Sequence, residues 1–488
     1  AGVHTLSQLA LLPTATKIDG MGAETVAKLS AQARLQLNAR ENGKHTFELL
    51  PPSRGRGFAM LPAPDDGDLF FDMEGDPLAG EGIEYLFGVY GRFAGAAQPE
   101  FRPVWGHDAV QEKAAFETAM RLFIDQMQRH PGAHIYHYAA YEPTALKRLA
   151  MRYATMEAEL DQLLRERRFV DLYRVVVQAL RASTEGYSIK DLEALYWHER
   201  TGDVKTASAS IVEYERWSVT HDAAILDSIA AYNKDDCVST AHLRNWLEGL
   251  RPVGINLEIV DERSQRQEQS AERVQLEARK QAIASAVRPC AHGDNRVRDL
   301  VAELLWFHQR SQKPGWWALF ERQAWSEEEL IDDAESLGGL EIDANTPPVS
   351  VKRSFDTTYK FLPQDTKLKV GDTPRVAETL GSCGTIVEIS AEDGRVVLRR
   401  GVKGAPLPER FSLVPAPINL QGVPDAVIAF AERFARGPTQ TDQALVDILI
   451  RRAPRLRGRA AGQEIRNAGE PLTDAVIRAV MDLDHSYL

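Results

Sequence analysis

The sequence predicts an α/β protein built from several domains, and three observations support this prediction. Its 488 residues exceed what one ordinary hydrophobic core accommodates, which indicates two to four domains. Residues 66–250 alternate apolar, strand-like runs with helical stretches, the pattern of an α/β domain. Residues 348–418 carry short β-type runs separated by Gly, Pro and Asp, which favours a small β-barrel or sheet module.

Three further regions complete the predicted domain organisation. They share a helical pattern and comprise residues 1–50, 255–345 and 419–488. Within the second of them, the Gln, Glu and Arg run at 262–281 indicates a long exposed helix. The predicted linkers are the Pro- and Gly-rich stretches 51–67 and 401–424.

Composition limits the classes of function. No apolar run reaches the roughly 20 residues that span a bilayer, so no membrane association is expected. Cys237, Cys290 and Cys383 lie far apart without Cys-x-x-Cys spacing, which argues against a zinc ribbon or an iron–sulfur site made by this chain and fits a cytoplasmic location. The formal net charge of -12 argues against a protein that coats nucleic acid through bulk charge. It does not exclude an enzyme acting on nucleic acid, because a site built from carboxylates is itself acidic.

The most informative segment is the run DLFFDMEGD at 68–76. Asp72 and Glu74 end an apolar run that is typical of a buried strand, and their spacing of two points both carboxylates to the same face. Two such anions repel each other unless a cation neutralises them, and Mg²⁺ or Mn²⁺ suits oxygen ligands. The alternative is a pair of exposed turn acids before Gly75 and Pro77.

A further acidic position lies on a helix predicted from about 226 to Leu250. Tyr232 and Asp236 are four residues apart and therefore share a helix face. A carboxylate there suits metal binding, and a phenol suits orienting the attacking water or the scissile phosphate. Taken alone, the segment fits an ordinary amphipathic helix with a half-buried tyrosine better.

Between these two segments, residues 133–138 are a predicted strand and a helix is predicted from about Pro143. Glu142 stands at the start of that helix, where the positive helix terminus accommodates its carboxylate without any metal. Asp171, in the run FVDL, is a predicted helix cap.

The order of these positions resembles the DEDD exonucleases of the branch with tyrosine in the last motif, and more narrowly the YprB-type ribonuclease H-like domain. The resemblance covers about 66–250 and implies a ribonuclease H-like mixed sheet flanked by helices. The residues to which it assigns catalytic roles are Asp72, Glu74, Glu142, Tyr232 and Asp236. The four carboxylates among them would hold two Mg²⁺ or Mn²⁺ ions roughly 3.5–4 Å apart for phosphodiester hydrolysis. The implied activity is 3′–5′ exonuclease cleavage of single-stranded DNA, with RNA as the alternative substrate.

The second motif departs from the family pattern. Aspartate after an Asn-x-x-Phe type sequence is usual there, whereas this chain has YAAYE ending in Glu142. The extra methylene alters how the second ion is held. A competing hypothesis is therefore a catalytically decayed nucleic-acid-binding or scaffolding module of a helicase, and Asp235 ranks lower as a substitute ligand.

Two segments are candidate nucleic-acid contacts. The run IDGMGAETVAKL at 18–29 resembles a helix-hairpin-helix motif, in which Gly20, Gly22 and Lys28 would contact the DNA backbone. Such motifs also serve as plain helix connectors or protein contacts. Arg455 and Arg457 belong to the Arg-rich run RRAPRLRGR, which is a basic patch or a solvated surface turn.

The arrangement as a whole resembles large bacterial proteins that combine a RecB-like nuclease, this ribonuclease H-like domain and a superfamily 1 helicase. The runs RENG at 40–43 and FELL at 47–50 look like a linker of that family, and VMDLDHSYL at 480–488 looks like the segment before the helicase phosphate loop. No GxxxxGK[ST] run occurs in the chain, so ATP binding of the P-loop kind is not expected. The resemblance implies a fragment whose full-length polypeptide contains a helicase motor. A weaker hypothesis is a protein-interaction platform that feeds a helicase.

Overall fold

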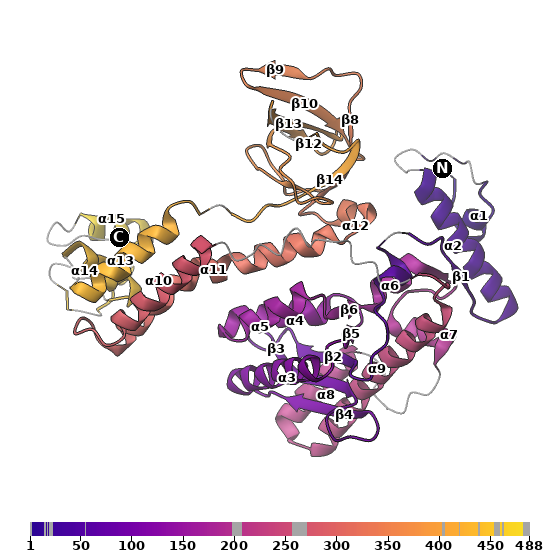
Figure 1. Cartoon of the computed structure of the whole chain (residues 1–488), viewed down its shortest axis with the longest axis horizontal. Helices are drawn as coiled ribbons and strands as arrows, with labels where there is room; N and C mark the ends of the chain where they lie inside the picture. Colours follow the sequence, from indigo (N-terminus) through magenta and orange to yellow (C-terminus); the bar gives the residue numbers. More distant parts are fainter. Residues whose placement is uncertain are drawn as a thin grey trace. The chain divides into compact units, whose positions relative to one another are not determined.

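The computed structural model divides into two compact units, residues 1–264 and 265–488, and each is described by itself. The residues that the structure describes are 2–13, 16, 18, 23–53, 55–197, 207–255, 271–402, 406–418, 420–437, 440–452, 459–460 and 463–481 (Figure 1).

The first unit is organised around a five-stranded mixed sheet in the order β4-β3-β2-β5-β6. Its strands are β2 (Leu69–Asp76), β3 (Ile83–Gly91), β4 (Glu100–Trp105), β5 (Ile135–His137) and β6 (Phe169–Asp171). The pairs β2–β3 and β3–β4 are antiparallel, whereas β2–β5 and β5–β6 are parallel. Strand β2, which carries the predicted acidic pair, is therefore paired on both edges.

Helices of the first unit lie around this sheet, and the first two in the chain lie apart from it (Figure 1). They are α1 (Leu6–Ala10), α2 (Ala23–Asn42), α3 (Ala109–Arg129), α4 (Tyr141–Tyr153), α5 (Glu157–Arg165), α6 (Leu172–Ala179), α7 (Ile189–Tyr196), α8 (Ala207–Thr220) and α9 (Ala223–Leu250). A short 3-10 helix η1 (Gly57–Met60) and a two-stranded sheet of β1 (Phe47–Leu49) and β7 (Leu180–Ala182) complete the unit. Helix α9 confirms the prediction of a helix to Leu250, and α4 begins two residues before Pro143.

The alternation of side chains along β2 places α3 and α9 on opposite faces of the sheet. Phe71 meets Phe123 of α3 edge-to-face, with ring centroids 5.0 Å apart. Its neighbour Phe70 points the other way, where the Arg244 guanidinium of α9 lies 5.2 Å from its ring centroid. Successive strand residues face opposite sides, so Asp72 and Glu74 share the α9 face with Phe70.

Helix α2 contacts the two-stranded sheet at the edge of this unit. Gln32 donates a hydrogen bond of 2.7 Å to the Ala182 carbonyl, and Gln36 donates one of 2.8 Å to the Thr184 carbonyl. Lys28 is exposed on α2, whereas Gly20 and Gly22 lie outside the described residues. The helix-hairpin-helix motif therefore stays a prediction.

The second unit contains a helical part and a sheet. Its helices are α10 (Ala271–Val287), α11 (Asn295–Gln323), α12 (Glu327–Asp332), α13 (Val423–Arg436), α14 (Gln440–Leu449) and α15 (Leu472–Val480). Val301 of α11, Phe434 of α13 and Val446 of α14 share one hydrophobic core. The predicted exposed helix at 262–281 is described only from α10 onward, and Arg455 and Arg457 lie outside the described residues.

The sheet of the second unit is antiparallel. Its strands are β8 (Leu337–Ile342), β9 (Val349–Val351), β10 (Ser354–Lys360), β11 (Arg375–Val376), β12 (Thr385–Ser390), β13 (Arg395–Gly401) and β14 (Arg410–Val414). They follow the path β11-β14-β8-β10-β13-β12, with β9 beside β10. These pairings do not confirm a closed barrel among the described residues.

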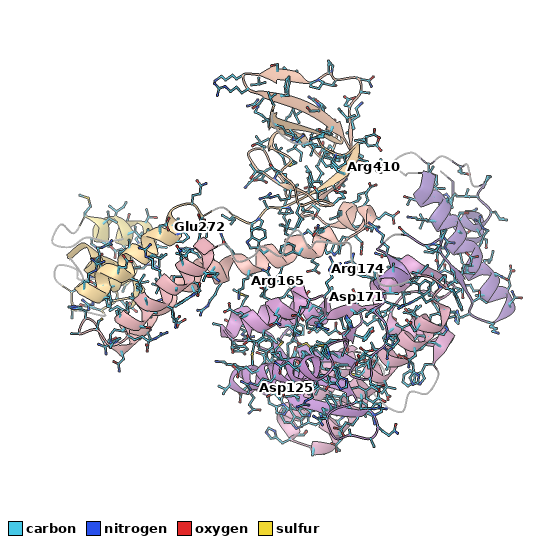
Figure 2. All side chains as sticks on the ribbon, in the orientation of Figure 1. Asp125, Arg165, Asp171, Arg174, Glu272 and Arg410 are labelled. Carbon is cyan, nitrogen blue, oxygen red and sulfur yellow. The ribbon has the colours of Figure 1, made fainter. Side chains whose placement is uncertain are left out.

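Strand β8 falls inside the stretch 255–345 that the sequence pattern assigned to a helical region. Its Leu337 and Leu340 fill the same core as Phe411 of β14, so their burial, rather than local helical propensity, decides the conformation. Arg410, labelled in Figure 2, joins β14 to its neighbours through ion pairs with Glu327 of α12 and Glu341 of β8. None of the helices in the described part of the chain combines the length and apolar composition needed to cross a membrane.

Candidate metal centre

Strand β2 presents the first two carboxylates of the site. Asp72 pairs with Gly88 of β3, and Glu74 pairs with Leu86, in regular antiparallel register. The register shifts between Glu74 and Gly75, directly after the second acid. The two carboxylates therefore project from the same face of the strand, as the period-two spacing predicts, and the register shift comes only after them.

Helix α9 brings the third carboxylate. Oxygen atoms of Asp72, Glu74 and Asp236 all lie within 4.8 Å of one another. Tyr232, one helical turn before Asp236, is 2 % exposed and so belongs to the same buried face of α9. Asp235 is also buried, but it is not a member of this group of three carboxylates.

Burial and the charge of Asp236 raise the pKa values of both acids on β2. Burial, followed by the charge of Asp236, raises the pKa of Glu74 to about 8, although hydrogen bonds with Ser210 and Asn233 lower it. Burial also raises the pKa of Asp72 well above its usual range, and Asp236, Glu74 and Glu142 add to the effect. Full ionisation at neutral pH therefore requires a positive charge among these oxygens, and an all-oxygen donor set suits a hard divalent cation.

Glu142 lies apart from this group. It is buried in the first turn of α4, and its Oε2 is 3.6 Å from Nδ1 of His137. Burial raises the pKa of Glu142, and the neighbouring His137 partly offsets the rise. The Oε2 atom has no hydrogen-bond partner in the described part of the chain, which is costly for a buried carboxylate and fits an oxygen that receives a cation. Whether Glu142 is a metal ligand stays a prediction.

Asn233 fixes the position of Asp72. Its Nδ2 donates a hydrogen bond of 2.6 Å to Oδ2 of Asp72. Room for this amide exists because residue 88 is a glycine: a Cβ atom there would lie 1.6 Å from Oδ1 of Asn233. The site thus depends on a strand residue without a side chain directly opposite Asp72.

One of the comparisons with known proteins gave a match. Residues 69–248 match the family model of the RNase H superfamily. This stretch, the RNase H domain, runs from the first residue of β2 almost to the end of α9 and contains the five residues assigned catalytic roles. Its five-stranded mixed sheet is consistent with an RNase H-like fold. Neither the comparison with curated proteins nor that with solved structures gave a match.

The family match supports the general prediction of a metal-dependent nuclease. RNase H-like domains are typically nucleases that use divalent metal ions, and the cluster of Asp72, Glu74 and Asp236 is able to bind one. The YprB subtype and the fusion to a helicase stay predictions.

Asp171 has the structural role that its sequence context predicts. As the cap of α6, it accepts a hydrogen bond of 2.9 Å from the backbone N–H of Tyr173, and Figure 2 labels it at the start of that helix. It also accepts one of 2.9 Å from the N–H of Ala139, whose φ of 69° lies in the left-handed region. Asp171 therefore stabilises the turn that leads from β5 to Glu142.

Sequence reasoning missed several side chains of this site, among them Asn233, His137 and Ser210. Asn233 lies three residues before Asp236, so helical spacing was a signal for it. His137 and Ser210 carry no such signal, because their partners Glu142 and Glu74 are recognised only once the elements are packed together.

Proposed function

We propose that the RNase H domain is a two-metal-ion exonuclease that hydrolyses single-stranded DNA from the 3′ end, using Mg²⁺ or Mn²⁺. The observation that carries the proposal is the convergence of Asp72, Glu74 and Asp236 within 4.8 Å inside this domain. The choice of substrate and the polarity follow from the resemblance to DEDD exonucleases.

Each side chain has a distinct role in this proposal. Asp72, Glu74 and Asp236 hold the ions, and Glu142 adds a ligand from α4. Bound divalent ions would supply the positive charge that activates water and stabilises the reacting phosphate. Asn233 keeps Asp72 oriented through its 2.6 Å hydrogen bond. The Tyr232 phenol, one turn from Asp236, orients the attacking water or a phosphate oxygen.

Incubation of the full chain with end-labelled single strands and Mn²⁺ tests the proposal. A 3′–5′ exonuclease shortens a 5′-labelled strand step by step, releases a 3′ label at once and leaves a circular single strand intact. Asp72→Asn keeps the shape of the side chain but removes its charge. It is expected to abolish both the shortening of the strand and the release of the 3′ label, and EDTA is expected to do the same. Degradation that survives in Asp72→Asn would exclude the proposed site.

A second function is favoured by the position of Glu142 outside the group of three carboxylates. In this alternative, the domain is a non-catalytic nucleic-acid-binding or scaffolding module of a helicase motor in the same full-length polypeptide. It predicts that the wild-type chain binds a single strand without cutting it at any Mn²⁺ concentration. Glu142→Asp, which restores the residue usual in the second motif, would then be the variant to examine for a gain of cleavage.

A further inference from the structure

Lys190 occupies an electrostatically unfavourable position in α7. Ser188 caps this helix and forms a reciprocal capping box with Asp191, so Lys190 stands in the first turn. The N-terminal end of a helix carries partial positive charge, which disfavours a cation there. The placement of Lys190 therefore needs compensating contacts, and two of these come from Tyr232 of α9.

Two contacts join Lys190 to Tyr232. Its Nζ donates a hydrogen bond to the phenol oxygen, and the same nitrogen lies 4.3 Å from the centroid of the ring. Lys190 is half-buried, and α7 packs against α9 along this stretch. An ammonium has donors only, so the phenol oxygen accepts this bond and keeps its own proton for donation.

The charge of Lys190 also reaches the carboxylates. It lowers the pKa of Asp72 and of Glu74, although burial is the larger influence and raises both. Lys190 thus lies within electrostatic range of the acids of β2 while it contacts the phenol of α9. If the acids and the phenol act on one substrate, its phosphate would therefore lie close to the Lys190 ammonium.

We propose that Lys190 is a positioning residue of the nuclease site, which holds the Tyr232 phenol in the orientation that phosphodiester cleavage requires. The inference rests on the proposed function, because it assigns Lys190 to that same reaction. It differs from a simpler role in which the ammonium only neutralises the acids. A neutralising cation competes with metal ions, so its removal would tighten Mn²⁺ binding and leave cleavage at saturating Mn²⁺ unchanged.

A double-mutant cycle on the full chain separates these roles. The variants are Lys190→Met, Tyr232→Phe and the two combined, with Lys113→Met on the exposed surface of α3 as the matched control. Single-turnover cleavage of a labelled single strand is measured at saturating Mn²⁺, and Mn²⁺ affinity is measured by titration calorimetry. Circular dichroism checks each fold, and Lys190→Gln replaces Lys190→Met if the latter does not fold.

We expect Lys190→Met to slow cleavage by about 10- to 100-fold, the usual cost of misplacing a group that must be aligned, with little change in KM. The loss should nearly vanish in the Tyr232→Phe background, because Lys190 acts through the phenol. Lys190→Arg, which keeps the charge and the donors, should recover part of the rate. Lys113→Met should cleave like the wild type.

Three results would overturn the inference. Cleavage by Lys190→Met at the wild-type rate, with or without tighter Mn²⁺ binding, removes the positioning role while the nuclease proposal stands. Losses that multiply in the double variant show that Lys190 does not act through Tyr232. A wild-type chain that does not cleave at all removes both the inference and the proposed function.

Discussion

Asp235 and Asp236 are adjacent acids on α9, and only Asp236 joins the carboxylates of β2. Both side chains are buried, so burial does not distinguish them. The distinction arises because successive helix residues point about 100° apart, which turns Asp235 away when Asp236 faces Asp72. At the scale of single residues, direction rather than proximity in the sequence decides which acid is able to bind a metal ion.

This difference gives the first prediction. Asp236→Asn should reduce single-turnover cleavage on the order of 10³-fold, comparable to the loss of one strong electrostatic group from an active site. Asp235→Asn, the same chemical change one position earlier, should keep most of the activity. Equal losses in the two variants, measured at saturating Mn²⁺, would contradict the assignment of Asp236.

Glu142 leads to the second prediction at this scale. Its buried Oε2 lacks a hydrogen-bond partner among the described residues, and His137 stands 3.6 Å away. If Glu142 adds a ligand for a second ion, Glu142→Gln should change the calorimetric stoichiometry from two Mn²⁺ ions to one. If the wild type and Glu142→Gln both bind two ions, the second ion does not need Glu142. If both bind one ion, the two-ion site is wrong.

At the scale of elements, the site depends on how closely α9 approaches β3. Gly88 lies opposite Asp72 in the sheet, and the Asn233 amide fills the space above it. Hydrogen bonding of this amide to Asp72 then couples the helix to the strand. A side chain at position 88 would therefore disturb the metal centre through Asn233 without touching any carboxylate.

Gly88→Ala tests this packing. The added methyl group overlaps Asn233 Oδ1 and should lower the free energy of unfolding by about 1–3 kcal/mol, the usual cost of overpacking. Cleavage should fall as well, because Asp72 loses its oriented partner. In the double variant Gly88→Ala/Asn233→Ala, urea unfolding should recover stability while cleavage stays low. If the double variant is no more stable than Gly88→Ala, the overlap with Asn233 is not the cause.

Periodicity made half of this site predictable. The spacing of two placed Asp72 and Glu74 on one strand face, and the spacing of four placed Tyr232 and Asp236 on one helix face. Lys190 was not predictable in this way, since 42 positions separate it from Tyr232 and only the packing of α7 on α9 brings them together. Strand β8 was missed for the same physical reason, because its conformation follows from burial against β14.

At the scale of the whole molecule, each unit has hydrophobic clusters of its own among the residues that the structure describes. Hydrophobic clusters that contain Phe70 or Tyr85 draw their members from residues 1–264. Clusters that contain Phe434 or Leu398 draw theirs from residues 265–488. Each unit therefore has the buried apolar surface on which cooperative unfolding depends.

Calorimetry of the full chain should consequently show more than one unfolding transition. Mn²⁺ binds only the folded carboxylate cluster, so it should raise the melting temperature of the transition that belongs to residues 1–264 and leave the others in place. The combined variant Asp72→Asn/Asp236→Asn is the control and should show no shift. A Mn²⁺ effect on every transition would mean that the units unfold together.

The size of that shift should depend on pH. The pKa of Glu74 is about 8 in the folded state, against 4.5 for an ordinary glutamate, because burial and Asp236 disfavour its charged form. A raised carboxyl pKa contributes stability that is complete below pH 4.5 and is lost as pH rises through 8, since the folded state then has to ionise a group that prefers its proton.

Without metal, the unit of residues 1–264 should lose this contribution between pH 5.5 and pH 8.5. Mn²⁺ competes with the proton for the same oxygens, so its stabilising effect should be larger at pH 8.5 than at pH 5.5. Melting curves at both pH values, each with Mn²⁺ and with EDTA, measure the difference, and a shift of equal size at both would show that Glu74 is not a site of this competition.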